Sequence, residues 1–103
     1  MTDEKTAKAC AALLQAIAEP NRIKIVDALR SGSKNVTEIS RLMQEEIVNV
    51  SHHLSVLRKA GLVRLRKDGR FVIYSLHPRF FRSDASNTTC LDFGWCRVEI
   101  PHH

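Results

Sequence analysis

The stretch Val50-Ser-His-His-Leu-Ser-Val-Leu-Arg-Lys-Ala-Gly-Leu-Val63 decides the fold of this chain. At a helical period of 3.6 residues, one apolar stripe collects Ile47, Val50, Leu54 and Leu57. The opposite face holds no acid, and it carries Val48, His52, Ser55 and Lys59, flanked by Asn49 and Ser51. Gly61 suits the left-handed residue that ends a helix. A helix with such a short polar face can approach base edges in the major groove of DNA.

A basic hairpin is expected directly after this helix. Residues 62–66 and 70–76 are strand-like runs around Lys67-Asp68-Gly69. Asp-Gly is a turn signal for hairpins, and Val72, Ile73 and Tyr74 favour a strand. The sequence therefore predicts a β-hairpin next to the two-faced helix.

Three further helices are expected before it. Residues 5–18 repeat apolar positions three and four apart, and they end at Glu19-Pro-Asn-Arg22, where Pro20 suits the first position of a second helix. Asn35 and Glu38 form a capping-box pattern for a third helix. Its expected buried positions are Val36, Ile39, Leu42 and Met43. The third helix, a short turn and the two-faced helix make a helix-turn-helix pattern.

The positive charge is concentrated in one part of the chain. The 103 residues carry a formal net charge of +5, yet residues 51–82 alone hold eight basic residues and one acid, a net +7. Residues 1–50 are balanced and residues 83–103 have a net charge of −2. Such clustering is typical of nucleic-acid binding, although a solvated basic face would give the same count.

Length and composition favour one small unit with a C-terminal extension. We expect residues 1–78 to form the DNA-binding and dimerisation domain, and residues 79–103 to form a tail that contains cysteine and is not helical. Within the tail, residues 83–89 are expected to be a polar linker, and residues 90–101, where Val98 and Ile100 alternate, are expected to form a turn and a short strand. No apolar run reaches bilayer length, and the polar N-terminus is not a secretory signal. These features predict a cytoplasmic protein with no membrane partner. His102 and His103 are left out of the functional argument because they can be native or a tag remnant.

The three cysteines are the candidate sensing residues. Cys90 and Cys96 lie in the tail, which is expected to be irregular, and soft thiolates select As(III), Sb(III), Zn or Cu(I). A trivalent metalloid needs three thiolates, and Cys10 can supply the third if the first helix of either subunit lies against the tail. Two alternatives stay open. Cys90 and Cys96 can form a reversible disulfide, and Cys10 can be a small core residue.

The chain resembles the ArsR/SmtB family of small winged-helix repressors. The resemblance runs over residues 13–78 and is carried mainly by Ser51-His-His-Leu-Ser-Val-Leu-Arg-Lys-Ala-Gly-Leu-Val63, Arg66-Lys-Asp-Gly-Arg70 and Glu19-Pro-Asn-Arg22. It implies a mainly α, winged helix-turn-helix fold with a β-hairpin wing. It also implies a homodimer that binds a partly palindromic operator in double-stranded DNA and is released by an effector.

The chain departs from the family pattern in three places. Gln44-Glu-Glu46 stands where members often carry a small residue and a Ser or Thr, so phosphate contacts there are expected to be unusual. The cysteine positions of thiolate-sensing members at the third helix are Asn35, Thr37 and Ser40 here, which excludes a soft-metal site on that helix. The long C-terminal helix is not evident. The tail instead resembles a variant in which a Gly-Cys-Cys run occupies positions 94–96.

Position on the helix and the hairpin gives the candidate DNA-binding residues. The base-edge or groove-wall candidates are Val48, Asn49, Ser51, His52 and Ser55, and the phosphate candidates are Arg58, Lys59, Arg64, Arg66, Lys67 and Arg70. His53 lies beside the apolar stripe, which favours a packed, hydrogen-bonded role.

The leading hypothesis is a repressor released from DNA by a thiol-reactive effector such as As(III), Sb(III) or another soft metal, with no obligatory cofactor. A disulfide-switch repressor, or a winged-helix module that binds another protein and has structural cysteines, are the alternatives. No catalytic constellation or phosphate-binding Gly-rich loop is present, so an enzyme is not expected.

Overall fold

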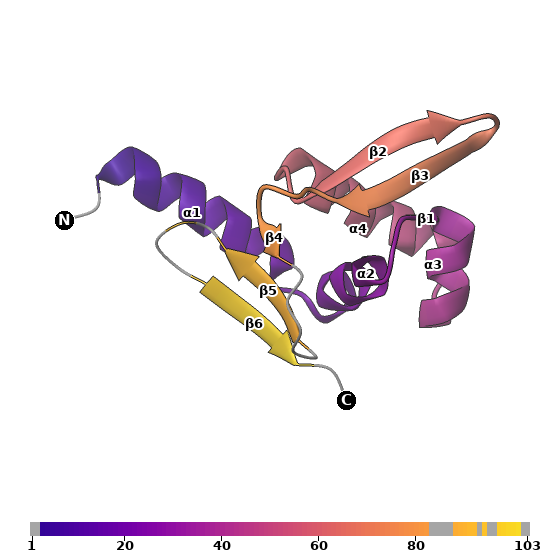
Figure 1. Cartoon of the computed structure of the whole chain (residues 1–103), viewed down its shortest axis with the longest axis horizontal. Coiled ribbons are helices and arrows are strands. Elements are labelled where there is room, and N and C mark those ends of the chain that lie inside the picture. Colours follow the sequence, from indigo (N-terminus) through magenta and orange to yellow (C-terminus); the bar gives the residue numbers. More distant parts are fainter. Residues whose placement is uncertain (1–2, 83–87, 93, 95–96, 102–103) are drawn as a thin grey trace.

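The computed structural model describes residues 3–82, 88–92, 94 and 97–101, and within them the chain forms four helices and two three-stranded antiparallel sheets. The helices are α1 (Glu4–Ile17), α2 (Pro20–Arg30), α3 (Val36–Met43) and α4 (Ile47–Lys59). The first sheet has the order β1 (Lys34–Asn35), β3 (Phe71–Leu76), β2 (Val63–Asp68). The second has the order β4 (Phe81–Arg82), β5 (Thr88–Asp92), β6 (Arg97–Pro101). Figure 1 shows the β2–β3 hairpin projecting at one end and the second sheet beside α1.

Local side-chain caps start three of the helices. Asp3 Oδ1 accepts a hydrogen bond from the Thr6 amide at 2.7 Å, and Glu19 Oε2 accepts one from the Arg22 amide at 2.9 Å at the start of α2, where Pro20 is the first residue. The predicted capping box of α3 is confirmed, since Asn35 Oδ1 accepts from the Glu38 amide at 2.8 Å and Glu38 Oε1 accepts from the Asn35 amide at 3.0 Å. These bonds satisfy backbone N–H groups that have no partner inside the helix.

The core is built around α4. Val50, Leu54 and Leu57 are fully buried, and they share one cluster with side chains of α1, α2, α3 and both sheets. The predicted apolar stripe is confirmed at these three positions and wrong at Ile47, which is 47% exposed. Ile47 is the first residue of α4, so it lies at the end of the stripe and not over the core.

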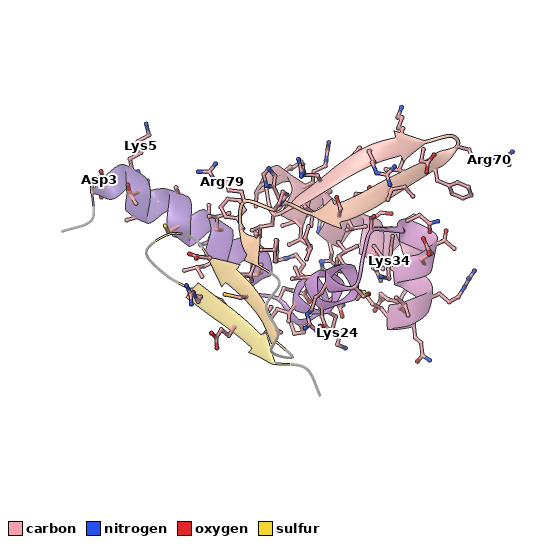
Figure 2. The ribbon with its side chains drawn as sticks, in the orientation of Figure 1. Asp3, Lys5, Lys24, Lys34, Arg70 and Arg79 are labelled. Atoms are coloured by element: carbon pink, nitrogen blue, oxygen red, sulfur yellow. The ribbon has the colours of Figure 1, made fainter. Side chains whose placement is uncertain are left out.

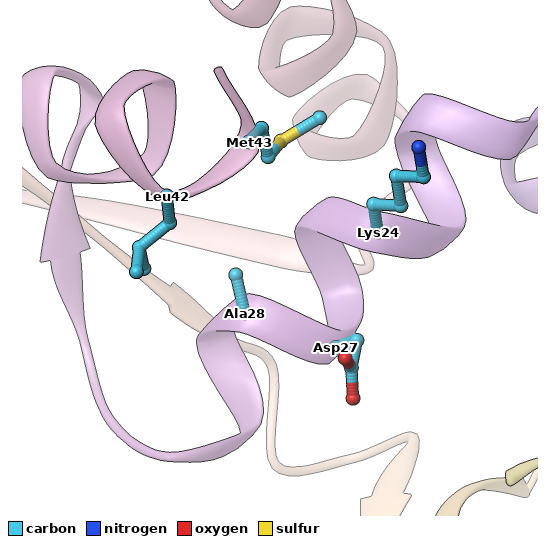
Figure 3. A pocket seen from close by; sticks show the side chains of 5 residues that line it. All are labelled: Lys24, Asp27, Ala28, Leu42 and Met43. Atoms are coloured by element: carbon cyan, nitrogen blue, oxygen red, sulfur yellow. The ribbon is translucent and has the colours of Figure 1, made fainter. Parts of the chain in front are cut away.

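Leu42 is the second correction, because it is 63% exposed and not buried. On the eight-residue α3, Ile39 and Met43 share the side that packs on the core, and Leu42 lies to one side of them. A shallow hollow of about 380 Å³ lies here between α2 and α3 (Figure 3). Figure 3 shows Leu42 and Met43 reaching it from α3, and Lys24, Asp27 and Ala28 lining it from α2.

The tail is more regular than the sequence indicates. The short strand expected from the alternation of Val98 and Ile100 is confirmed as β6. Residues 88 and 89 were expected in a polar linker and Cys90 in an irregular segment, but all three belong to β5, which pairs with both β4 and β6. Leu91 is fully buried in the main core, and Val98 and Ile100 pack against it. The alternation of these residues gives the tail an apolar sheet face that needs the core for cover.

Helix α1 is only partly covered by the rest of the chain. Cys10, Ala16 and Ile17 are buried, whereas Leu14 is 36% exposed and its neighbours Ala7 and Ala11 are exposed. The predicted fold class, a mainly α winged helix-turn-helix with a hairpin wing and a non-helical tail, is confirmed over the described residues. Among the helices of the described residues, none has both the length and the apolar content needed to cross a bilayer.

Candidate nucleic-acid interface

The outer face of α4 is open to solvent. Val48 is 76% exposed, Asn49, Ser51 and His52 are exposed, and Ser55 is half-buried. These residues face solvent because Val50, Leu54 and Leu57 are buried on the opposite side of α4. Four of the five base-edge candidates are therefore exposed to a partner, and Ser55 is partly so.

Hydrogen bonds fix the acidic start of α4. Asn49 Nδ2 donates to Glu45 Oε1 at 2.8 Å, and this bond, together with the Glu46 amide at 3.2 Å, lowers the pKa of Glu45 against the effect of desolvation. The Ser40 hydroxyl donates to the Glu45 backbone carbonyl. The Asn49 side-chain amide uses one N–H in this bond, which orients it. Its second N–H and its oxygen can still hydrogen-bond to a base.

A polar cluster fastens α4 to the start of α2. His53 Nδ1 lies 3.4 Å from Arg22 Nη1 and 3.6 Å from Glu19 Oε2, and the His53 side chain is 14% exposed. Arg22 also donates from Nε to the Ala16 carbonyl at 2.6 Å. The expected packed, hydrogen-bonded role of His53 is confirmed. The sequence predicted Glu19-Pro-Asn-Arg22 as a helix break and the start of the second helix, but its contact with α4 is a long-range feature that no local pattern signals.

The carboxylate of Glu19 is held in its charged form. Desolvation acts to raise its pKa, but hydrogen bonds from the backbone of Arg22 and Asn21 and the positive charges of His53 and Arg22 outweigh it, and the pKa lies below its ordinary value. The Arg22 amide donates to Glu19 Oε2 at 2.9 Å, so the same carboxylate caps α2. The Glu19 side chain thus both caps the start of α2 and helps to orient α4 through His53.

The wing carries exposed cations to its tip. Arg58 and Lys59 are exposed in the last turn of α4, and so are the wing residues Arg64, Arg66, Lys67 and Arg70. Asp68 pairs with Phe71, so the turn is Gly69-Arg70, one residue further along than predicted, and Gly69 takes a φ of +62°. Figure 2 shows Arg70 at this tip. Arg66 forms an exposed ion pair with Asp68 at 3.8 Å, which is weak enough to exchange for a phosphate.

An exposed aromatic ring at the wing tip was not among the expected residues. Phe71 is 54% exposed although it opens strand β3. The strand pattern of residues 70–76 predicts a half-buried side chain here, but the hairpin extends beyond the core and leaves its first residues uncovered.

Two of the three cysteines, Cys10 and Cys90, belong to the part of the chain that the structure describes. Cys10 on α1 is 6% exposed and Cys90 on β5 is 5% exposed, and neither belongs to the main apolar cluster. Cys96 lies outside the described residues. Among the residues that are described, no three Cys, His, Asp or Glu side chains gather into a group that could hold a metal ion. The metal set Cys90, Cys96 and Cys10 stays a prediction.

The comparisons with known proteins agree with this geometry. A family model described as bacterial regulatory protein, arsR family, matches residues 19–64. The chain is 41% identical over 75 residues to the HTH-type transcriptional regulator NmtR of Mycobacterium tuberculosis, covering 73% of this chain and 62% of that protein's length. It is 32% identical over 65 residues to the transcriptional repressor SdpR of Bacillus subtilis, covering 63% of this chain and 72% of that protein.

A solved structure shares the architecture. The homodimeric winged helix-turn-helix DNA-binding domain of Mb0332 from Mycobacterium bovis superimposes with a TM-score of 0.69 at 27% identity, covering 77% of this chain and 75% of that one. The named relatives are transcriptional regulators and not enzymes. The chain belongs to the arsR family of bacterial regulatory proteins.

Proposed function

We propose that this chain is a homodimeric transcriptional repressor that reads a partly palindromic operator through α4 and grips the DNA backbone with its wing. The observation that carries this proposal is that the polar face of α4, Arg58 and Lys59 in its last turn, and Arg70 in the wing are exposed. Short polar side chains are suited to base edges, and the flanking cations are suited to phosphates.

Homodimer formation is supported by the exposed side of α1. Leu14, Ala7 and Ala11 leave apolar surface uncovered in a single chain, and a small chain gains stability from burying such surface against a second copy. The Mycobacterium bovis domain with the same architecture is a homodimer. We propose the same assembly here, with residues 1–78 as the DNA-binding and dimerisation domain.

For release from DNA we propose a thiol-reactive effector such as As(III), Sb(III) or another soft metal, bound through Cys90, Cys96 and Cys10 in the tail and α1. The supporting observation is that Cys10 on α1 and Cys90 on β5 are both buried, and that both elements contribute side chains to one core cluster. Each holds a thiol outside that cluster. A Cys90–Cys96 disulfide is the second candidate for the same switch.

The DNA half of the proposal is tested by the salt dependence of binding. A repressor of this type binds a duplex selected from a random library with an affinity that falls steeply as salt rises. Weak binding that is nearly independent of salt would support a protein-interaction module instead.

The effector half is tested with the reduced protein and the double variant Cys90→Ser, Cys96→Ser. Arsenite, zinc or a mild oxidant is expected to release the parent protein from the duplex and to leave the double variant bound. Native mass spectrometry separates metal from disulfide by mass, and Cys10→Ser alone tests the third thiol. Release of the double variant by all three agents would refute a sensing role for the tail cysteines.

A further inference from the structure

The largest hollow among those described lies between α1, the end of α4 and the segment that follows the wing. Its volume is about 720 Å³, within the range of small-molecule sites. Its apolar lining includes Ala9 and Leu13 from α1 and Phe80 from the segment after β3. Figure 2 shows Lys5 and Arg79, which also line it, on the same side of the molecule.

The charge around this hollow has one sign. Among the described residues that line it, Lys5, Lys59 and Arg79 are cations and none is an acid. Arg79 lies over the Phe80 ring, with its guanidinium carbon 5.3 Å from the ring centre, so the cation is held where the apolar lining begins. An apolar floor with a cationic rim is complementary to a molecule that has an apolar body and a negative head.

The hollow touches the proposed recognition helix. Lys59 is the last residue of α4 and Ala60 is its C-cap, and both line the cavity. A negative group bound at this rim would compete with phosphate for Lys59 and would contact the end of the helix that reads the DNA.

We propose that this hollow binds an amphiphilic organic anion, a single negative head on an aliphatic or aromatic body, and that binding weakens DNA affinity. The second part rests on the proposed function, whereas the first concerns the free protein alone. The ligand is held by charge and apolar contact, so its binding needs no cysteine chemistry, although Cys10 of the proposed thiol switch also lines the hollow.

Direct binding to the DNA-free protein is the first test. Isothermal titration calorimetry with decanoate, below its micelle concentration, is compared with decyltrimethylammonium, which has the same chain length and opposite charge. We expect decanoate to bind and the cation not to bind. Lys5→Glu is expected to weaken decanoate binding roughly five- to tenfold. The matched control is Lys8→Glu, which reverses an exposed lysine of the same helix that does not line the hollow and leaves the affinity within about twofold.

A second variant fills the cavity without changing its charge. Ala9 is exposed on α1, so Ala9→Phe is tolerated by the fold and is expected to abolish decanoate binding while DNA binding persists. Decanoate is expected to lower the DNA affinity of the parent protein and not that of Ala9→Phe.

Three results would overturn the site: equal binding of both surfactants, equal effects of Lys5→Glu and Lys8→Glu, or loss of the dimer in Lys5→Glu by sedimentation. The last would show that a second copy of the chain covers the hollow. Decanoate binding in a protein that binds no DNA would instead refute the proposed function and leave the site standing.

Discussion

Arg70 at the wing tip provides the sharpest test of how this chain binds DNA. The turn Gly69-Arg70 places the Arg70 side chain beyond the paired strands, so Arg70→Gln removes one positive charge without removing core packing. Each phosphate contact contributes about 0.9 to the slope of log affinity against log salt. For a homodimer, the loss of one contact per subunit is expected to flatten the slope by about 1.8.

The size of this effect is measurable. Between 50 and 200 mM salt, a slope of about 1.8 corresponds to roughly a 12-fold change in affinity, so the parent protein loses that much more affinity than Arg70→Gln over this range. Fluorescence anisotropy of a labelled duplex gives the slope directly. Lys8→Gln, an exposed lysine of α1 paired with Glu4, is the control and leaves the slope unchanged.

A slope for Arg70→Gln that equals those of the parent and of Lys8→Gln would refute the reasoning. It would mean that the wing tip does not reach the DNA backbone, whatever its exposure and charge. A parallel loss of affinity at every salt concentration, without a change in slope, would point to a base or shape contact at Arg70 instead.

Three further predictions concern the scaffold that holds this surface. Leu54→Ala removes a fully buried side chain and is expected to lower the free energy of unfolding by about 2–5 kcal/mol in urea, whereas Val48→Ala on the exposed side of α4 changes it by less than about 0.5 kcal/mol; equal effects would contradict the assigned helix faces. Asn35→Ala removes the side-chain cap on the Glu38 amide and is expected to cost about 1 kcal/mol, and an unchanged urea midpoint would show that the cap adds nothing. Glu19 has a folded-state pKa below its ordinary value of 4.5, so its contribution to stability is complete above that value and is lost as pH falls through the folded pKa. Glu19→Gln is expected to remove this part of the pH dependence, and identical urea-against-pH profiles for both proteins would exclude it.

Much of the fold was readable from local patterns. The spacing of Val50, Leu54 and Leu57 predicted which side of α4 is buried, and the Asn35 and Glu38 pair predicted the start of α3. The concentration of cations after residue 50 located the expected DNA-binding surface. These features depend on residues close together in sequence, where helix and turn geometry alone fixes which side chains are neighbours.

The burial of residues at the ends of the apolar patterns could not be predicted from the sequence. Ile47 and Leu42 fit the helical period, yet both are exposed, because periodicity gives the direction of a side chain and not whether another element covers it. In the tail, the sequence predicted one short strand from the alternation of Val98 and Ile100, but not the three-stranded sheet. Leu91 of β5 is buried in a core formed mainly by residues that are distant in the sequence. β-structure depends on such partners more than helices do.

By itself, the sequence determined the class of fold, the two faces of α4 and the sign of the charge on the surface around it. Only the tertiary structure decided that His53 contacts Arg22 and Glu19, that Cys10 and Cys90 are buried outside the main core, and that Lys5, Lys59 and Arg79 surround one hollow. The physical reason is separation along the chain. Local geometry fixes what a residue can present, and chain folding over tens of residues fixes what it meets.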